Sequence, residues 1–362
     1  MKPTLYIHIG RPKTGSTALQ HFLMKNRQAL LAQGILYPLT GSYQLSSHLF
    51  AYAYSESMRE SASLPPIDRD ALWEKLSIEM ASQPASALVL SSENFWFVDP
   101  AVLAADLQDQ FAVKVIAYIR RQDNVIASSF CEEVKREHIT LDADVTDYAL
   151  YKPRLALLDY LDILDAWSIA FGSDNLQVRV YERLVEKGIA RDFCELLSIN
   201  PAEFEIDPAA INPGLPYDVL SLISNARAFK SGDAAKRRFV TALSESVVML
   251  DHDSAYDTSG LFPHNLRERV MKTFARSNAA IAKKYLPGDV GELFPVLSQE
   301  VYRPPSRALD PQRMARLLLG LQANQEKSNI RFLRRLAKLE RQVEHQAELI
   351  NAMARHNESG NG

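Results

Sequence analysis

Short apolar runs alternate with longer amphipathic stretches along the first two hundred residues of the chain. Four runs rich in β-branched and aromatic residues predict strands over 4–9, 87–90, 113–119 and 176–181. Helical periodicity occupies the stretches between them, most clearly over 16–31 and 154–171. Strands that alternate with helices are typical of an α/β fold, with a central parallel sheet flanked by helices. In such sheets ligands bind beyond the carboxyl ends of the strands.

The C-terminal third has a different pattern. Residues 201–305 contain many prolines and predict helices joined by loops, and 310–356 are rich in Leu, Ala, Gln, Glu and Arg. Apolar residues there follow a 4–3 spacing at Phe332, Leu336, Leu339, Val343, Ile350 and Met353. We therefore expect a main domain over 1–305 and a helical C-terminal extension over 306–362. The extension either packs on its own domain or forms a coiled coil that joins subunits into a homo-oligomer.

Composition narrows the class of protein. Of the 362 residues, 47% are hydrophobic and 23% are charged, so the chain can bury a large core and disorder throughout is excluded. The net charge of 41 − 44 = −3 argues against binding nucleic acid. Because no run of 18 apolar residues occurs and the start lacks the apolar core of a signal peptide, no membrane span is expected. With Cys131 and Cys194 as the only cysteines, we expect a cytoplasmic protein.

The turn after the first strand has the composition of an anion-binding loop. It reads Gly10-Arg11-Pro12-Lys13-Thr14-Gly15-Ser16-Thr17 and leads into a helix. Small residues let backbone N–H groups converge on an anion, and the helix N-terminus adds positive potential. The two glycines and Thr17 match the loop of nucleotide triphosphatases, but Ser16 occupies the lysine position and Lys13 lies inside the loop. The pattern favours a phosphate-like ligand in some other chemistry; an ordinary strand–turn–helix junction is the alternative.

The loop resembles the 5′-phosphosulfate loop of sulfotransferases that use 3′-phosphoadenosine 5′-phosphosulfate (PAPS), approximately P-K-[ST]-G-[ST]-[ST]. A second motif of that family, a strand ending in Arg with a Ser eight residues later, matches Arg120 and Ser128. The resemblance covers about residues 1–200. It implies a P-loop-like fold, PAPS as donor without a metal, and a hydroxyl acceptor. Two departures, Ala18 in place of an adenine-stacking tryptophan and only a faint echo of a late phosphate motif at 230–232, point to a bacterial or carbohydrate-type branch and hence to a glycan or glycolipid acceptor.

The resemblance also implies roles for individual residues. Lys13 would stabilise the bridging oxygen of the leaving phosphate, and Arg120 with Ser128 would hold the 3′-phosphate. The 5′-phosphosulfate would be held by the loop residues Arg11, Lys13, Thr14, Gly15, Ser16 and Thr17.

In-line sulfuryl transfer also needs a general base for the acceptor hydroxyl. Glu93, after the second predicted strand, is favoured, and His48 is the second candidate. We expect His8 to be a packed core residue and Arg121 to face away and pair with an acid.

Two other functions stay open from the sequence. A P-loop kinase-like enzyme would bind magnesium and ATP, which Ser16 at the usual lysine position disfavours. A non-catalytic coiled-coil scaffold would depend on residues 332–353 and not on Lys13.

Overall fold

The computed structural model describes most of the chain. The described residues are 2–136, 138–141, 143–184, 186–206, 215, 217–226, 233–250, 261–288, 292–294, 312, 314–327 and 329–330. The chain divides into two compact units, one of 1–214 with 257–305 and the other of 215–256 with 306–362. The expected boundary at 305 stays a prediction, and the structure adds that 215–256 belong with the C-terminal unit.

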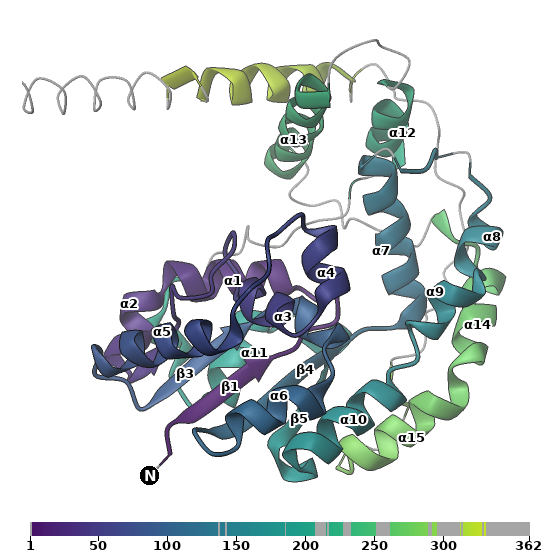
Figure 1. Cartoon of the computed structure of the whole chain (residues 1–362). Coiled ribbons are helices and arrows are strands. Elements are labelled where there is room, and N and C mark those ends of the chain that lie inside the picture. The colour runs from purple at the N-terminus through teal and green to yellow at the C-terminus, as the bar shows by residue number, and fades with distance from the viewer. Residues whose placement is uncertain are drawn as a thin grey trace, which may run out of the picture. The chain divides into compact units, whose positions relative to one another are not determined.

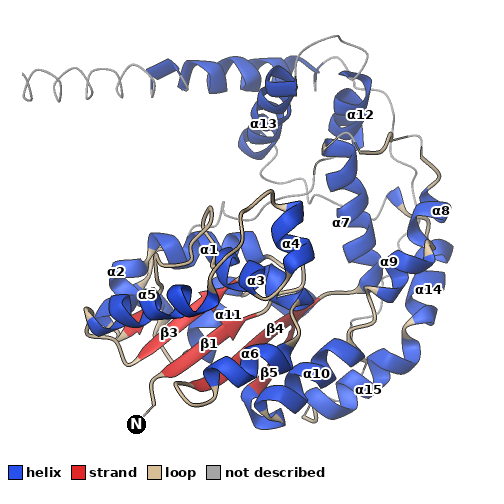
Figure 2. Cartoon of the chain, in the orientation of Figure 1, coloured by secondary structure: helices blue, strands red, loops and turns tan. Residues whose placement is uncertain are grey.

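A five-stranded parallel sheet forms the centre of the first unit, as predicted (Figure 2). Its strands are β1 (Thr4–His8), β2 (Ile35–Leu36), β3 (Ala87–Ser91), β4 (Ala112–Ile119) and β5 (Leu176–Val180), in the order β2-β3-β1-β4-β5. Every pairing is parallel. The four predicted strands are confirmed. The two-residue edge strand β2 was not expected, because it is too short to show a period.

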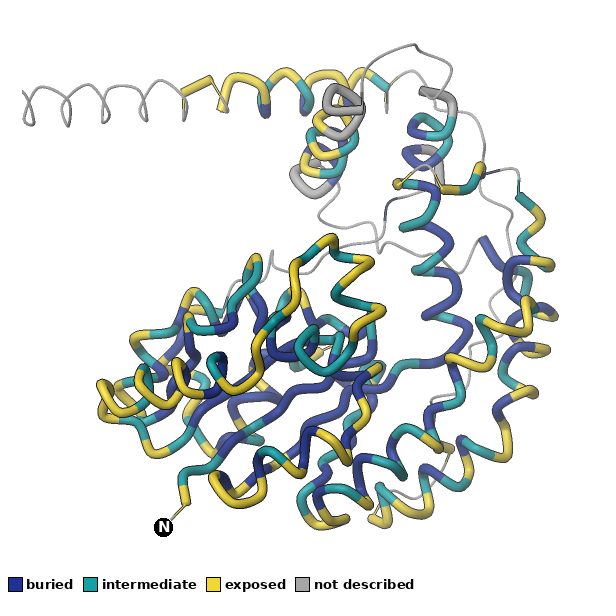
Figure 3. The backbone as a smooth tube through the Cα atoms, in the orientation of Figure 1, coloured by how far each residue is buried: buried dark blue, intermediate teal, exposed yellow. Residues whose placement is uncertain are grey.

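Helices cover both faces of this sheet (Figure 1). On one face, α1 (Ser16–Lys25), α2 (Arg27–Ala32) and α11 (Ile189–Leu196) share a buried core with Val89, Ile116 and Tyr118 of the strands. On the other, α10 (Leu161–Phe171) packs on β4, β5 and α6 (Pro100–Leu107). The strands are accordingly buried along most of their length (Figure 3). The α/β fold class predicted from the sequence is confirmed.

The remaining helices of this unit lie between the strands or after β5. They are α3 (His48–Ala53), α4 (Glu56–Ser61), α5 (Arg69–Ala81), η1 (Glu93–Phe97), α7 (Gln122–Lys135), α8 (Val145–Ala149), α9 (Lys152–Ala156), η2 (Ser173–Asn175), η3 (Tyr181–Leu184), η4 (Pro201–Glu203), α14 (His264–Thr273) and α15 (Ala275–Tyr285).

Two helices predicted as continuous are broken. The stretch 16–31 divides at Asn26, whose side-chain amide donates to the carbonyls of Phe22 and Glu205 and accepts from the Glu205 N–H. These bonds reach 179 residues along the chain, so local periodicity could not reveal them. The stretch 154–171 divides into α9 and α10.

The second unit is helical where it is described, which confirms the helical C-terminal region. It contains α12 (Tyr217–Ala226), α13 (Asp233–Leu250) and helical residues 314–327. Asn324 of the last helix donates to the carbonyl of Ala242 at 3.3 Å and to the hydroxyl of Ser246 at 3.1 Å. The heptad positions from Phe332 to Met353 lie outside the described residues, so the coiled coil and the homo-oligomer stay predictions.

Within the described ranges, none of the helices combines the length and the apolar character that crossing a membrane requires.

Candidate functional site

The loop after β1 and the residues after β4 meet where the chain's connections diverge. From β1 the chain runs to the β2–β3 side of the sheet, and from β4 it runs to β5 on the other side. Such a divergence, at the carboxyl ends of adjacent parallel strands, is where open α/β sheets bind ligands. The backbone N–H groups of Ile9 and Arg11 donate to the carbonyls of Ile116 and Tyr118, so the loop continues along β4.

The loop has a strained, tightly turned backbone. Gly10, Lys13 and Gly15 have φ of 34°, 75° and 86°. A side chain at Gly15 would also place its Cβ 2.9 Å from the ring of Tyr181, so both the conformation and the space demand glycine there. A left-handed lysine is uncommon, and such residues cluster at functional sites. The N–H and hydroxyl of Thr14 both bond the Arg11 carbonyl, at 3.2 and 2.5 Å, and close the turn.

Helix α1 begins without a side-chain cap. Ser16 is buried in its first turn and Thr17 is exposed. Within the described part of the chain, the N–H groups of Gly15, Ser16 and Thr17 donate to no acceptor. A helix start with free N–H groups carries a partial positive charge and is suited to an anion.

Buried polar atoms without a partner gather around this loop. Among the described residues seven buried side-chain N or O atoms lack a hydrogen bond, and five of them belong to His8, Arg11, Ser16, Arg120 and Glu182. Native proteins satisfy nearly all buried polar groups, so such a cluster calls for an explanation. Three of the five, Arg11 Nε, Arg120 Nε and the Ser16 hydroxyl, are donors that an anionic ligand can satisfy. The loop residues therefore fit a phosphate-like group.

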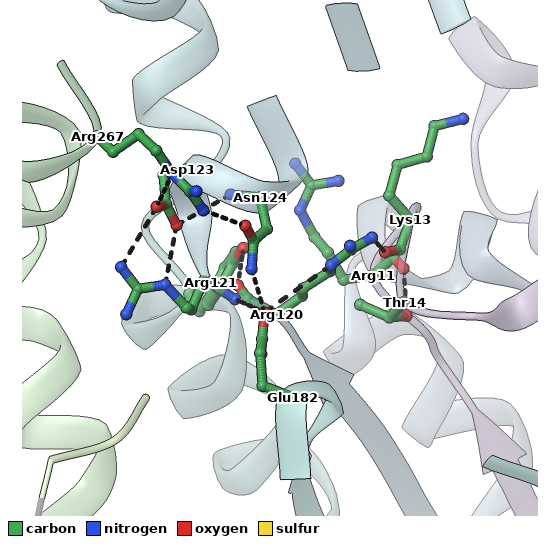
Figure 4. A network of polar contacts seen from close by, with 10 residues as sticks. Arg11, Lys13, Thr14, Arg120, Arg121, Asp123, Asn124, Glu182 and Arg267 are labelled. Atoms are coloured by element: carbon green, nitrogen blue, oxygen red, sulfur yellow. Dashed lines mark hydrogen bonds and ion pairs between the residues drawn. The ribbon is translucent and has the colours of Figure 1, made fainter. Parts of the chain in front are cut away.

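Arg120 links the two halves of the site (Figure 4). Its Nη1 donates to the carbonyl of Lys13 at 2.9 Å, its Nε lies 3.8 Å from Glu182 Oε1, and its guanidinium lies 5.0 Å from the centre of the Tyr181 ring. The structure thus brings Arg120 to the loop, as the motif suggested. Ser128 lies on α7 and is half-buried, and its hydroxyl makes no hydrogen bond to a described residue.

The next residue, Arg121, belongs to a buried ionic cluster. Its Nε donates to Asp123 at 3.1 Å, and Arg267 of α14 donates to the other carboxylate oxygen at 2.8 Å. Their side chains are at most 8% exposed. Glu182 accepts from the Arg121 N–H and from the Asn124 amide. Arg121 therefore pairs with an acid, as expected. The roles of Asp123, Glu182 and Arg267 were not predicted, because no sequence motif marks residues that meet through long-range contacts.

The Lys13 side chain extends away from Arg120 (Figure 4) and pairs with a carboxylate of α7. Its Nζ lies 3.6 Å from Glu132 Oε2, and both side chains remain about a quarter exposed. Burial lowers the pKa of Lys13, and the Glu132 carboxylate partly counters this. The sequence offered no sign of this pairing.

The two candidate bases both lie near the end of β3, Glu93 just after this strand and His48 at the start of α3, where it bonds Ser92. His48 is buried; its Nε2 lies 3.0 Å from the Ser46 hydroxyl and its Nδ1 lies 2.7 Å from that of Ser92. Asn94 Nδ2 lies 3.2 Å from the same Nδ1. Burial lowers the pKa of His48, and the negative charge of Glu93 opposes this. Both ring nitrogens of His48 are thus engaged by neighbouring side chains.

Glu93 is more available. It is half-buried, and its Oε2 accepts from Gln20 of α1 at 2.8 Å. Gln20 is itself buried and holds the carboxylate between the first turns of α1 and the end of β3. Among the described residues, no donor reaches the other oxygen, Oε1.

His8, at the end of β1, is a packed core residue, as predicted. It is fully buried, contacts Tyr118 and Phe193 edge-on, and bonds the Ser91 hydroxyl at 2.8 Å. Burial lowers its pKa to about 3.

Comparisons with known proteins give distant likenesses. No family model matches the chain, and no curated protein matches it. A sulfotransferase structure from Alicyclobacillus acidocaldarius is 16% identical, with a TM-score of 0.39, over 66% of this chain and 100% of that one. The sulfotransferase domain of the Synechococcus PCC 7002 olefin synthase is 15% identical, with a TM-score of 0.35, over 76% and 95%. The sulfotransferase domain of the curacin biosynthetic pathway is 13% identical, with a TM-score of 0.33, over 76% and 98%. Likenesses at this level do not assign a function.

No group of three or more His, Cys, Asp or Glu side chains is placed to hold a metal ion in the portion of the chain that the structure describes.

Proposed function

We propose that this chain is a sulfotransferase that moves a sulfuryl group from PAPS to an acceptor hydroxyl. One observation supports the proposal above the others: the loop after β1 and Arg120 after β4 are joined by a 2.9 Å hydrogen bond and surround unpartnered donors. A donor with two separate anionic groups, a 5′-phosphosulfate and a 3′-phosphate, matches the two cationic regions at this edge of the sheet, the loop with Lys13 and the guanidinium group of Arg120. Ser16 at the usual lysine position favours this donor over magnesium-bound ATP.

The loop and α1 would hold the phosphosulfate through free N–H groups and the Ser16 hydroxyl, with Thr14, Gly15 and Thr17 shaping the turn. Arg11, whose Nε makes no hydrogen bond to a described residue, would add positive charge. Arg120 and Ser128 would hold the 3′-phosphate, in line with the family motif.

The transfer forms one bond to sulfur, breaks another and moves one proton. The acceptor oxygen attacks sulfur, the bond from sulfur to the bridging oxygen breaks, and 3′-phosphoadenosine 5′-phosphate leaves. Negative charge grows on the bridging oxygen, where the Lys13 ammonium group would stabilise it. The acceptor proton goes to a general base.

We propose Glu93 as that base. Its carboxylate has one oxygen held by Gln20 and the other free among the described residues, whereas both nitrogens of His48 are engaged. His48 remains the second candidate and would otherwise orient Ser92 and Asn94 beside Glu93. The glycan or glycolipid acceptor is proposed from the carbohydrate-type resemblance alone.

Transfer of label from ³⁵S-PAPS to a panel of glycans and simple alcohols tests the proposal. We expect release of 3′-phosphoadenosine 5′-phosphate in step with labelled product, and loss of both in Glu93→Gln. Activity kept by Glu93→Gln and lost in His48→Asn would exchange the roles of the two candidates. Consumption of magnesium-ATP with PAPS untouched would replace the proposal by the kinase-like alternative.

A further inference from the structure

The ammonium group that would act on the donor is paired with a carboxylate of the protein. Lys13 Nζ lies 3.6 Å from Glu132 Oε2 on α7, and the Lys13 side chain extends away from Arg120 (Figure 4). Both side chains are about a quarter exposed, so a ligand and water can reach the pair. In this position the Glu132 carboxylate already balances the positive charge of the Lys13 ammonium group.

Glu132 also forms ion pairs with two other cationic side chains. Arg136 Nε, at the C-cap of α7, lies 3.0 Å from Glu132 Oε1, and Lys135 Nζ, in the last turn of α7, lies 3.7 Å from Oε2. Burial acts to raise the pKa of Glu132, but Lys13, Lys135 and Arg136 together hold it below the usual value. If Lys13 moved away, Glu132 would still be paired with two cations. Losing the pair with Lys13 therefore costs less free energy than leaving the Glu132 carboxylate without any cationic partner.

The backbone of Lys13 is held on both sides. The Lys13 carbonyl accepts from Arg120, and Thr14 closes the turn onto Arg11. The side chain is held by the ion pair with Glu132. A change of partner by Nζ would therefore need rotation about the side-chain torsions of Lys13 and no rearrangement of the loop backbone.

We propose that Glu132 is a positioning residue that holds the Lys13 ammonium group in the donor-free enzyme and releases it to the phosphosulfate of the arriving donor. This inference rests on the proposed function. Donor binding becomes an exchange of ion pairs, in which Lys13 leaves Glu132 for the ligand and Glu132 keeps Lys135 and Arg136. Glu132 therefore weakens donor binding without taking part in the transfer step.

Titration calorimetry with 3′-phosphoadenosine 5′-phosphate on the full-length wild type and Glu132→Gln tests the exchange. We expect about fivefold tighter binding in the variant, which corresponds to the energy of a partly exposed ion pair. With PAPS as substrate, KM for the donor should fall by a similar factor while kcat stays within about twofold, because the pair exists only before the donor binds.

Glu133→Gln is the matched control. It makes the same charge change one residue along α7, and glutamine can still accept the hydrogen bond from the Tyr148 hydroxyl. A general electrostatic effect would tighten binding in both variants alike, and that result would overturn the proposal. In a Lys13→Met background, Glu132→Gln should give no gain; a full gain there would also overturn it.

A readout that needs no donor separates this inference from the proposed function. The Lys13 amine, followed by NMR after ¹³C-dimethylation of the lysines, should titrate at lower pH in Glu132→Gln than in the wild type. An unchanged titration would overturn the pairing itself. If the titration shifts as expected but 3′-phosphoadenosine 5′-phosphate binds neither protein, the proposed function fails, and the donor exchange fails with it.

Discussion

Two adjacent arginines at the end of β4 serve two different regions of the molecule. Arg121 enters a buried cluster in which Asp123 accepts from both Arg121 and Arg267. Arg120 enters the loop after β1, where its own Nε, 3.8 Å from Glu182 Oε1, and the buried atoms of Arg11 and Ser16 make no hydrogen bond. Among the described residues, no buried side-chain N or O atom of Arg121, Asp123 or Arg267 lacks a hydrogen bond, so this ionic cluster is saturated and the loop is not.

The difference separates a structural polar network from a binding one. A saturated cluster fixes α14 against α7 and offers nothing to a ligand. An unsaturated set of donors at the point where the sheet's connections diverge leaves hydrogen-bonding capacity for an anion. Variants in the cluster should therefore change stability, and variants in the loop should change donor binding and turnover.

The largest effect should come from Lys13. Lys13→Ala should lower kcat by about a thousandfold, since a charge-stabilising group aimed at the leaving oxygen is worth that order. The partly exposed side chain contributes little to folding, so the unfolding midpoint should barely move. Turnover of ³⁵S-PAPS and thermal unfolding measure the two effects. Wild-type turnover in this variant would contradict the assigned role and favour a non-catalytic scaffold.

A substitution in the saturated cluster should do the reverse. Asp123→Asn removes the charge that two buried arginines share, and leaving them without it should cost about 3 kcal/mol of unfolding free energy. Urea denaturation gives the cost. The protein that remains folded should still bind the donor, because the Asp123 carboxylate bonds Arg121, Asn124 and Arg267 rather than the loop after β1. A stability equal to the wild type would mean that the cluster is not structural.

Arg120→Ala should weaken the binding of 3′-phosphoadenosine 5′-phosphate by about tenfold to a hundredfold, in line with the loss of charge-assisted hydrogen bonds to a phosphate. The free energy of unfolding should change by less than about 1 kcal/mol, because Glu182 still accepts hydrogen bonds from the Arg121 N–H and the Asn124 amide. Calorimetry on the folded variant measures the affinity. Unchanged affinity would remove Arg120 from the donor site.

The last prediction concerns His8, whose effect is confined to acid pH. Burial lowers the pKa of His8 to about 3, below the unfolded value of about 6.5, so the unfolded chain binds the extra proton. Its contribution to stability is complete above pH 6.5 and is lost as pH falls toward 3, with a slope of up to about 1.4 kcal/mol per pH unit. His8→Asn should show a flatter profile over this window in urea denaturation. A parallel profile would mean that His8 does not set the acid sensitivity.

The sequence predicted the sheet and the loop because both depend on local pattern. β-branched runs mark β1, β3, β4 and β5, and the glycine spacing marks the turn at Gly10 and Gly15. The breaks in the two long helices, the edge strand β2 and the partners Glu132, Glu182 and Arg267 were not predictable. Each depends on contacts between residues distant in the sequence, and neither periodicity nor a short motif records such contacts.

The most direct test of the account is titration of the purified full-length chain with 3′-phosphoadenosine 5′-phosphate without magnesium, beside magnesium-ATP. The unsaturated donors of the loop and Arg120 predict tight binding of the first ligand and weak binding of the second. Tight binding of magnesium-ATP with no response to 3′-phosphoadenosine 5′-phosphate would contradict the account and assign the loop to a kinase-like enzyme.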